Sequence, residues 1–506
     1  MSFRSVPGVA RPLALAALSL AVAGALALPE GAHASAFQLK ENSAKGLGRA
    51  YAGSATAGGD VSVVANNPAA MSDLDGTYFQ ADVTAVNFGA KFNGSAYDAL
   101  GRPISGGNGG DAGTTLPVPA LSFATKVSDR VNVGIALDVP FGFQTEYDHD
   151  WMGRYDAIKT KLQSFDSTLS ASFKINDQWS VGASAIAERT NADLTNAVNV
   201  NAIGLKLQQG IAAQAAAQAA AAIAQVQAAV AAGQISPAQA AAMIQQIQQQ
   251  AQQGAAAAAG GVAAATPVGA DGSAEVKGNS WAWGWQAGAY WKPTANDRVA
   301  LDYRSRITHD IDGTANFTTT PGYGLLLTNP ALAANLPPFQ RTAGKARLTN
   351  PAVATLSYWH QEEKFGLGFD LAWTQWSVMR QLTLTYANPA QPTTVLPFNW
   401  RDTWYASVGG EYYATDKLTL RAGVAVDQAP MNASNRDPRV PDAARRMATF
   451  GIGYKASDRF EINASYAHIF VSHAGVNGAT SSTGDVLTGS YDDYGNLLSL
   501  SAQYKF

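Results

Sequence analysis

The most constraining feature of the sequence is a strand-like alternation that repeats from Asp75 to the C-terminus. In each segment apolar residues occupy every second position, and small or polar residues occupy the positions between them. Residues 365–373, for example, alternate Phe, Leu, Phe, Leu and Trp with Gly, Gly, Asp and Ala. Successive side chains of a β-strand point to opposite faces, so this period of two predicts a sheet with one apolar and one polar face.

Very short turns join these segments in pairs, and longer loops connect one pair to the next. The short turns are rich in Asp, Asn and Ser, which favour turn conformations, and they lie at residues 128–130, 176–178, 292–297, 362–364, 415–416 and 456–458. Outer-membrane β-barrels have short periplasmic turns and longer extracellular loops. The predicted strands begin near Asp75, Pro117, Val131, Lys161, Trp179, Glu275, Arg298, Thr342, Phe365, Trp400, Lys417, Ala443, Arg459 and Tyr491. These are fourteen strands, an even number that places both ends of the barrel chain on the periplasmic side.

A soluble β-sandwich would show the same period, so the orientation of the apolar face needs a second argument. Many of the segments are longer than strands of soluble proteins, and aromatic residues gather near their ends, at Trp281, Trp283, Trp285, Trp373, Trp376, Trp400 and Trp404. Long strands and aromatic girdles indicate an apolar band that faces lipid. We therefore predict an all-β fold, a fourteen-stranded antiparallel transmembrane β-barrel in the bacterial outer membrane.

Charged residues on the opposite face would project into the barrel interior, where charges must pair or meet water. We expect an interior network of Asp302, Arg304, Asp370, Arg421 and Asp427. Structural ion pairs are the simpler interpretation of such residues, and ligand contacts are the alternative.

The first 34 residues have the features of a secretory signal peptide. Arg4 and Arg11 form a basic region, residues 13–28 are apolar, and residues 32–34 form an A-x-A cleavage signal. A retained membrane anchor is the alternative. We expect the mature chain to start at Ser35 and residues 75–506 to form one barrel domain, because no interdomain linker interrupts them.

Residues 35–74 are rich in Gly and Ala and lack strict alternation. Their scattered apolar residues and the sharp turn at 66–69 predict a compact hatch, or plug, enclosed by the barrel. A flexible N-terminal arm is the alternative. The candidate hatch and gate residues are Ser35, Phe37, Leu39, Asn66, Asn67, Pro68 and Ala69.

An Ala/Gln-rich block at residues 201–274 interrupts the strand pattern. Residues 207–270 contain no charged side chain, and Ala and Gln are good helix formers. The sequence Ser-Pro-Ala-Gln at 236–239 predicts a helix N-terminus with a capping box, so we expect two helices that meet near Gly233. We predict an extracellular helical hairpin, in which Ile223, Val226 and Val230 pack against Met243, Ile244 and Ile247. Capture of apolar ligands and disorder are the alternatives.

Composition and motifs exclude several classes of function. The chain has no cysteine, which excludes disulfides and thiolate sites, and its formal charge of -3 gives no case for nucleic acid. Neither a G-x-S-x-G nor an H-E-x-x-H motif is present, so we expect no enzyme activity, no metal and no cofactor. A general diffusion porin and an outer-membrane lipid hydrolase are the rival functions.

Several dispersed motifs resemble the FadL-type family of long-chain fatty acid and hydrocarbon transporters. The matching stretches are residues 35–39, 46–51, 67–69, 139–142, 151–155, 373–377 and 421–423, followed by Asp427, Pro430, residues 441–442 and Arg445. The resemblance covers essentially the whole mature chain except the Ala/Gln-rich block, which departs from the simplest members.

The resemblance implies passive uptake of hydrophobic molecules through a plugged barrel, with lateral release into the membrane where the third strand kinks inward. In this sequence the implied opening is Asp138, Val139, Pro140, Phe141 and Gly142, although Pro140 could also merely end the strand. Arg154 is the candidate partner for a ligand carboxylate. We further expect a monomer that contacts outer-membrane lipid and lipopolysaccharide and uses the outer-membrane assembly machinery. Whether the substrate is a fatty acid or an aliphatic or aromatic hydrocarbon stays open, because apolar pockets discriminate weakly.

Overall fold

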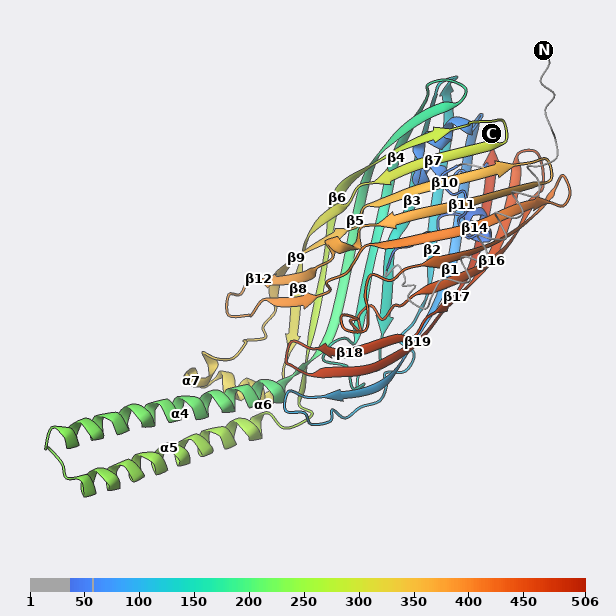
Figure 1. Cartoon of the computed structure of the whole chain (residues 1–506). Coiled ribbons are helices and arrows are strands. Elements are labelled where there is room, and N and C mark those ends of the chain that lie inside the picture. Colours follow the sequence, from blue (N-terminus) through green and yellow to red (C-terminus); the bar gives the residue numbers. More distant parts are fainter. Residues whose placement is uncertain (1–36, 57–58) are drawn as a thin grey trace, which may run out of the picture.

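The computed structural model describes residues 37–56 and 59–506, which form a closed antiparallel β-barrel (Figure 1). The sheet closes because the first strand, β1 (Thr77–Tyr97), pairs along its length with the last, β19 (Val486–Lys505). The proposed signal peptide at residues 1–34 and the proposed mature start at Ser35 lie outside the described residues.

Among the described residues, the wall contains nineteen strand segments that make up fourteen strands, because five of the strands are each interrupted once. The other uninterrupted strands are β2 (Thr115–Ser128), β3 (Val131–Glu146), β4 (Lys159–Lys174), β5 (Trp179–Asn199), β6 (Asp271–Trp291), β15 (Leu418–Asp427) and β16 (Arg445–Lys455). The interrupted strands join β7 (Asp297–Arg304) to β8 (Ile307–Thr318), β9 (Thr342–Asn350) to β10 (Val353–Gln361), β11 (Phe365–Thr374) to β12 (Gln381–Tyr386), β13 (Thr394–Pro397) to β14 (Thr403–Tyr413), and β17 (Phe460–Val471) to β18 (Ala474–Thr480). The prediction of a fourteen-stranded antiparallel barrel is confirmed.

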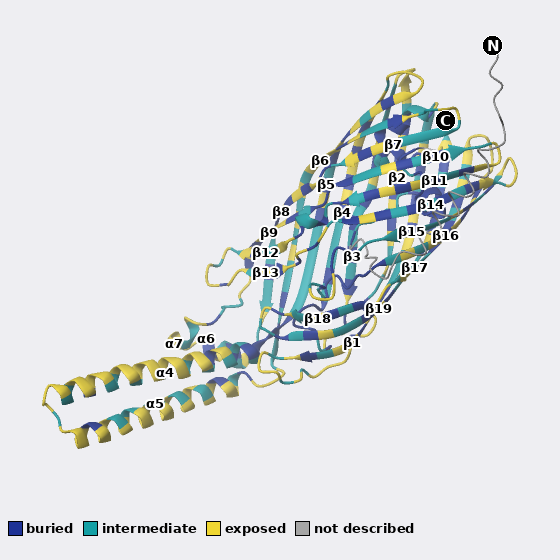
Figure 2. Ribbon diagram, in the orientation of Figure 1, coloured by how far each residue is buried: buried dark blue, intermediate teal, exposed yellow. Residues whose placement is uncertain are grey.

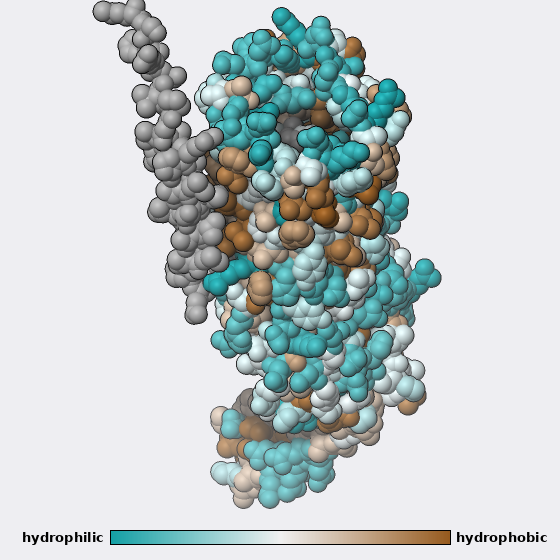
Figure 3. Space-filling view, turned by 90° about the vertical axis from the view of Figure 1, so that its right-hand side faces the viewer, coloured by the Kyte–Doolittle hydropathy of each residue, from teal (hydrophilic) through white to brown (hydrophobic). Residues whose placement is uncertain are grey.

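The alternation predicted from the sequence separates an inner from an outer face of the wall. Along most strands buried and exposed residues alternate (Figure 2), and in β11 the exposed Phe369 and Leu371 flank the buried Asp370. Hydrophobic residues gather around the middle of the barrel, between more hydrophilic zones (Figure 3). Such a band matches the hydrocarbon layer of a membrane.

Two of the expected girdle aromatics are exceptions, and the prediction for them was wrong. Trp281, Trp283 and Trp285 are exposed on the outer face, but Trp376 and Trp400 are buried inside the barrel. Both lie where a strand is interrupted, Trp376 in the 3-10 helix η2 (Trp376–Val378) between β11 and β12 and Trp400 between β13 and β14. The chain leaves the wall there, so the strict alternation of faces no longer applies. Among the described residues, none of the helices is both long enough and apolar enough to cross a bilayer.

The described residues that precede β1, 37–56 and 59–76, lie inside the lumen and contain three short helices, α2 (Ala44–Gly48), α3 (Val63–Asn66) and η1 (Pro68–Asp73). Side chains of the inner wall hold this hatch: Lys45 Nζ lies 2.9 Å from Glu461 Oε2, and Ser170 Oγ donates to the carbonyl of Val64 at 2.8 Å. The wall is also shaped for the hatch, because a Cβ on Gly423 would lie 2.4 Å from the carbonyl carbon of Arg49.

The Ala/Gln-rich block forms a hairpin of two helices, α4 (Val200–Ala231) and α5 (Pro237–Ala265). It projects from the end of the barrel opposite the C-terminus (Figure 1). The predicted capping box is present, since Ser236 accepts from the amide of Gln239 and the Gln239 side chain accepts from the amide of Ser236. Gly233 adopts a φ of 70° between the helices, a conformation that favours glycine. Of the predicted apolar stripes, Val226 is buried but Met243 is exposed.

The base of the hairpin is anchored to the end of the barrel opposite the C-terminus. Two short helices, α6 (Pro321–Leu327) and α7 (Pro330–Ala333), follow β8, and a cluster of buried apolar residues joins α6 to the hairpin and to β5 and β6. Its members include Val198, Val200, Leu207, Val262 and Tyr323. The rest of the hairpin does not pack against this core.

Candidate ligand pathway

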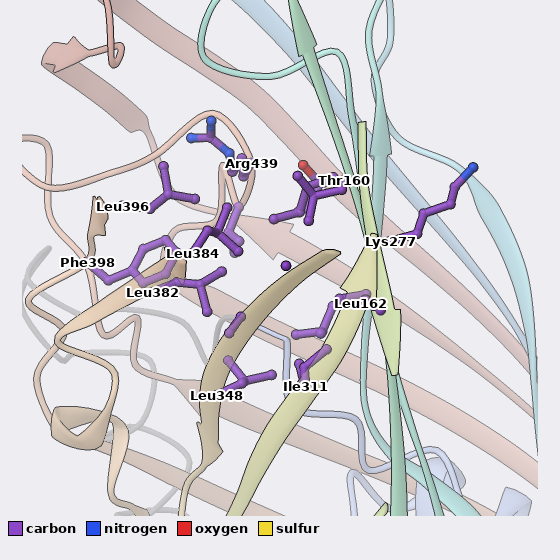
Figure 4. Close-up of a pocket in the computed structure, with 18 of the residues that line it drawn as sticks. Thr160, Leu162, Lys277, Ile311, Leu348, Leu382, Leu384, Leu396, Phe398 and Arg439 are labelled. Atoms are coloured by element: carbon purple, nitrogen blue, oxygen red, sulfur yellow. The ribbon is translucent and has the colours of Figure 1, made fainter. Parts of the chain in front are cut away.

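An apolar cavity, here called the inner cavity, lies inside the barrel (Figure 4). Residues of the hatch, of uninterrupted strands, of interrupted strands and their breaks, and of the loop between β15 and β16 line this cavity. They include Phe37, Phe143, Thr160, Leu162, Leu194, Ile311, Leu348, Met379, Leu382, Leu384, Leu396, Phe398, Trp400, Arg439 and Val440. The free space is only ≈ 70 Å³, so a ligand must displace side chains to enter. Lys277 borders this cavity through its backbone, since its side chain points away (Figure 4).

Arg439 is the cationic side chain at the edge of this apolar lining. It is buried, and its Nη1 lies 3.0 Å and 2.9 Å from the two carboxylate oxygens of Asp437. Its Nη2 donates to the main-chain carbonyl of Asp156. Burial raises the pKa of the Asp156 carboxyl to about 8, and the nearby Arg439 charge opposes this shift. The guanidinium is therefore fixed in position beside the cavity.

A second apolar cavity of ≈ 310 Å³, here called the exit cavity, lies against the barrel wall at β2 and β3. Its lining is mostly apolar, with residues from the hatch, β1, β2, β3, β4, β16, β17 and β19: Phe37, Leu39, Val86, Phe88, Leu116, Pro117, Val118, Pro119, Val139, Phe143, Phe165, Ile469 and Leu497, with Gln38, Glu41 and Arg445 among the polar residues. Pro117, Pro119 and Phe165 are exposed on the outside of the barrel, so this cavity reaches the wall itself.

The wall strands β2 and β3 separate at this cavity. Their pairing runs from Val131 only to Leu137, while the preceding part of β2 pairs with β1 alone. The pairing of β3 with β4 shifts register between Asp138 and Phe141, on either side of Pro140. Proline has no N–H to donate to a ladder, which favours such an irregularity.

The N-terminal end of the hatch pairs with β3 where β2 has left it. The amide of Leu39 donates to the carbonyl of Pro140 at 2.8 Å, and the amide of Gly142 donates to the carbonyl of Phe37 at 2.9 Å. The structure therefore brings the candidate gate residues Phe37 and Leu39 together with residues 138–142, the candidate lateral opening.

Phe37 borders both cavities and is 3% exposed. Its ring packs edge to face against Trp376 at 4.8 Å between centroids and lies 6.0 Å from Phe141 and 5.8 Å from Trp400. One aromatic side chain of the hatch thus stands between the inner cavity and the break in the wall.

Comparison with known proteins agrees with this architecture. A family model described as "Outer membrane protein transport protein (OMPP1/FadL/TodX)" matches residues 25–506. The chain belongs to this family. The protein is accordingly an outer-membrane β-barrel of a family of transporters for long-chain fatty acids and hydrocarbons.

Relatives of this FadL-family protein span nearly its full length. A putative outer membrane protein of Neisseria meningitidis serogroup B is 28% identical over 94% of this chain and 95% of its own. The long-chain fatty acid transport protein of Escherichia coli strain K12 is 27% identical over 89% of this chain and 91% of its own. Among solved structures, a Pseudomonas aeruginosa FadL homologue has a TM-score of 0.77 at 29% identity, covering 93% of this chain and 100% of that chain. The toluene transporter TodX of Pseudomonas putida, at 18% identity and a TM-score of 0.58, shares the fold over 93% of this chain and 100% of that chain.

Ser35 lies outside the described residues, and the other hatch candidates, at residues 66–69, lie away from both cavities of this FadL-family protein. Asn67 Nδ2 donates to the carbonyl of Ala55 at 3.0 Å, and its Oδ1 accepts from the amide of Ala69 at 3.1 Å. Pro68 is the first residue of η1, and the Asn66 side chain bonds to that of Asn42. These residues shape the hatch rather than line the pathway.

The five charged lumen candidates form several clusters instead of one network. Arg304 lies 2.8 Å from Glu188 and also pairs with Asp166, while Arg421 lies 3.0 Å from Glu411, which also binds Arg49 of the hatch. The other three candidates are placed separately: Asp302 accepts from Gln286, Asp370 accepts from the hatch amide of Gly53, and Asp427 lines a small pocket with Lys40 and Tyr405. Several of these clusters attach the hatch to the wall.

Arg154, the carboxylate partner suggested by the sequence, is engaged elsewhere in this FadL-family protein. Its Nε lies 2.7 Å from Asp271, and its other nitrogens donate to Tyr155 Oη and to the carbonyls of Ser105 and Trp151. It is not among the residues that line the inner or the exit cavity. Its role as a carboxylate partner stays a prediction, and Arg439 is a buried cation that the fold brings to the inner cavity. Sequence reasoning missed Arg439 because the loop at residues 428–444 has no periodic pattern.

Proposed function

We propose that this protein takes up long-chain fatty acids passively across the outer membrane. The observation that carries the proposal is the pair of apolar cavities separated by Phe37, the second of which lies where β2 and β3 part. An acyl chain gains about 0.8 kcal/mol per methylene when it leaves water for an apolar site. A chain of cavities ending at the wall lets the ligand reach lipid without crossing the polar outer surface, and no energy source is needed.

Arg439 supports an acid over a neutral hydrocarbon as the substrate. Burying a charge costs free energy, and a fixed guanidinium at the edge of the cavity does not help to bind a neutral hydrocarbon. A carboxylate can instead share the Arg439 donors with Asp437 through charge-assisted hydrogen bonds. The name of the Escherichia coli relative, a long-chain fatty acid transport protein, is in keeping with this substrate class.

The proposed gate is the docked end of the hatch. For the ligand to pass from the inner to the exit cavity, the Phe37 ring must leave its contacts with Trp376 and Trp400. Residues 138–142 are then the rim of a lateral opening through which the acyl chain reaches the membrane.

The test compares binding and uptake of labelled oleate and toluene by the wild-type protein and by Arg439→Leu. Loss of one charge-assisted hydrogen bond should weaken oleate binding by about tenfold or more and leave toluene unchanged. Arg439→Lys should restore part of the oleate binding. Arg130→Leu, at the exposed turn between β2 and β3, is the matched control and should behave as the wild type.

Other outcomes would separate the rival functions. Uptake of toluene without oleate would replace the fatty acid by a hydrocarbon substrate. Steady large openings in planar bilayers would contradict a plugged pathway and favour a diffusion porin.

A further inference from the structure

A polar groove lies on the outer face of the barrel wall, across the wall from the inner cavity, with which it shares Ala192, Lys277, Gly278 and Gly313. It encloses ≈ 470 Å³ and is bordered by β4, β5, β6, β8 and the residue before β9. We call it the wall groove; its polar lining residues are Lys161, Asn191, Asp193, Lys277, Asn279, Asp312, Thr314, Asn316 and Arg341. The Lys277 side chain points away from the inner cavity, which places it on the outer side of the wall (Figure 4).

The strand register arranges these side chains in two rows across the wall. In one row Lys161 on β4 is paired with Asp193 on β5, which is paired with Lys277 on β6. In the next row Asn191 on β5 is paired with Asn279 on β6. Directly paired residues of neighbouring antiparallel strands point to the same face, so both rows are presented together.

The wall groove lies immediately above the lipid-facing band. Toward the periplasmic end, Trp281 lies two residues beyond Asn279 on β6, and Phe165 lies two residues beyond Gln163 on β4. Trp281 is 59% exposed and Phe165 is 40% exposed. At a rise of about 3.4 Å per residue, this places the Asn191 row only about 7 Å beyond the first lipid-facing aromatic residues. Aromatic belts mark the membrane interface, so the wall groove is at the level of the headgroups of the outer leaflet.

The charges of the wall groove are only partly neutralised by one another. Within the part of the chain that the structure describes, Lys161 and Arg341 form no ion pair, whereas Lys277 lies 3.8 Å from Asp193. Asp312 is neutralised by Lys345 at 3.2 Å. Two cations therefore border the groove without a counter-charge among the described residues.

The wall groove also offers acceptors and amides. The carboxylate of Asp193 and the side chains of Asn191 and Asn279 line the same space. Cations suit phosphate oxygens, while a carboxylate and amides suit the hydroxyl and amide groups of a sugar. A simple phosphodiester would use only the cations.

We propose that the wall groove binds the phosphorylated sugar headgroup of an outer-leaflet glycolipid. One of its phosphates contacts Lys161 and another contacts Arg341 on the opposite side of the groove, and its sugar hydroxyls donate to Asp193. The acyl chains run down the wall over Phe165 and Trp281, which are exposed to lipid. The site holds the barrel at a fixed depth in the outer leaflet and acts independently of fatty acid transport.

The test is lipid binding by the full-length mature protein after delipidation in detergent, followed by native mass spectrometry. The probes are diphosphorylated lipid A, dephosphorylated lipid A and phosphatidylglycerol. The wild type should bind the diphosphorylated form in preference to both others. The double variant Lys161→Gln/Arg341→Gln should weaken that binding by about tenfold or more, since each basic residue near a lipid surface contributes about one factor of five.

Two matched variants keep the test decisive. Lys126→Gln/Lys174→Gln removes an exposed and a half-buried lysine charge near the periplasmic turns, both paired with an aspartate, and should leave lipid A binding within about twofold of the wild type. Asn279→Trp fills the groove without changing its charge and should weaken lipid A binding while leaving phosphatidylglycerol binding unchanged. Equal binding of all three probes by the wild type, or unchanged lipid A binding by the Gln double variant, would overturn the proposal.

Discussion

The docking of Phe37 is the contact on which the proposed gate depends, and Phe37→Ala tests it. The end of the hatch is held to β3 by two backbone hydrogen bonds, from Leu39 to Pro140 and from Gly142 to Phe37. At a net 0.5–1.5 kcal/mol each, these contribute about 1–3 kcal/mol. Truncation of a buried phenylalanine to alanine costs about 3–5 kcal/mol, and the edge-to-face contact with Trp376 adds to the loss.

The packing of the Phe37 ring therefore contributes more free energy to docking than the two backbone hydrogen bonds do. Without the ring, the pairing of the hatch with β3 should be lost. A loss of about 3 kcal/mol shifts the docking equilibrium by roughly a hundredfold. Hydrogen–deuterium exchange followed by mass spectrometry should show faster exchange at the amides of Leu39 and Gly142 in Phe37→Ala, while amides of the barrel strands remain protected. Bound oleate should also dissociate faster from the variant, because the two cavities become continuous.

Phe88→Ala is the control. Phe88 lines the exit cavity, and its ring centroid lies 6.0 Å from that of Phe143, but Phe88 is not part of the hatch. It should leave the exchange of Leu39 and Gly142 unchanged. If Phe37→Ala exchanges like the wild type at these two amides, or if Phe88→Ala has the same effect, the ring does not dock the hatch and the argument fails.

Two further predictions concern the extracellular end. The pKa of Asp156 is raised from 3.8 to about 8 by burial, so the folded protein holds a proton that the unfolded chain releases; stability should fall as the pH rises from about 4 to 8. Thermal unfolding in detergent should show a weaker pH dependence for Asp156→Asn, and an equal slope in both proteins would contradict this assignment. Replacing residues 212–258 by a short Gly/Ser linker should leave the unfolding temperature within a few degrees of the wild type, because only the base of the hairpin joins a core shared with the barrel. Loss of the folded barrel band in unheated gel electrophoresis would show that the hairpin supports the wall.

The periodic parts of the chain were predictable because the membrane imposes one rule on them. Every wall strand must bury its backbone groups in a closed ladder and present apolar side chains to lipid, so strand number, turns and orientation follow from the alternation. The hairpin was predictable for a different reason, since the cap at Ser236 and the turn at Gly233 are local signals.

The pathway could not be predicted at the same level. Trp376 and Trp400 look like girdle residues in the sequence, but interruptions of their strands turn them inward against Phe37. Arg439 approaches the inner cavity only because the loop after β15 folds back into the barrel, and the partner of Arg154 is Asp271, more than a hundred residues away. Contacts of this kind depend on tertiary packing that no local pattern specifies.

The interrupted strands have a consequence for how such a transporter can diversify. Four consecutive wall strands, from β7/β8 to β13/β14, are broken, and the segments on either side of the breaks keep their own pairing partners. The residues between β11 and β14 can therefore be exchanged, lengthened or reshaped without forcing a change of register on the rest of the cylinder. A new substrate preference can therefore arise between β11 and β14 while the barrel remains closed.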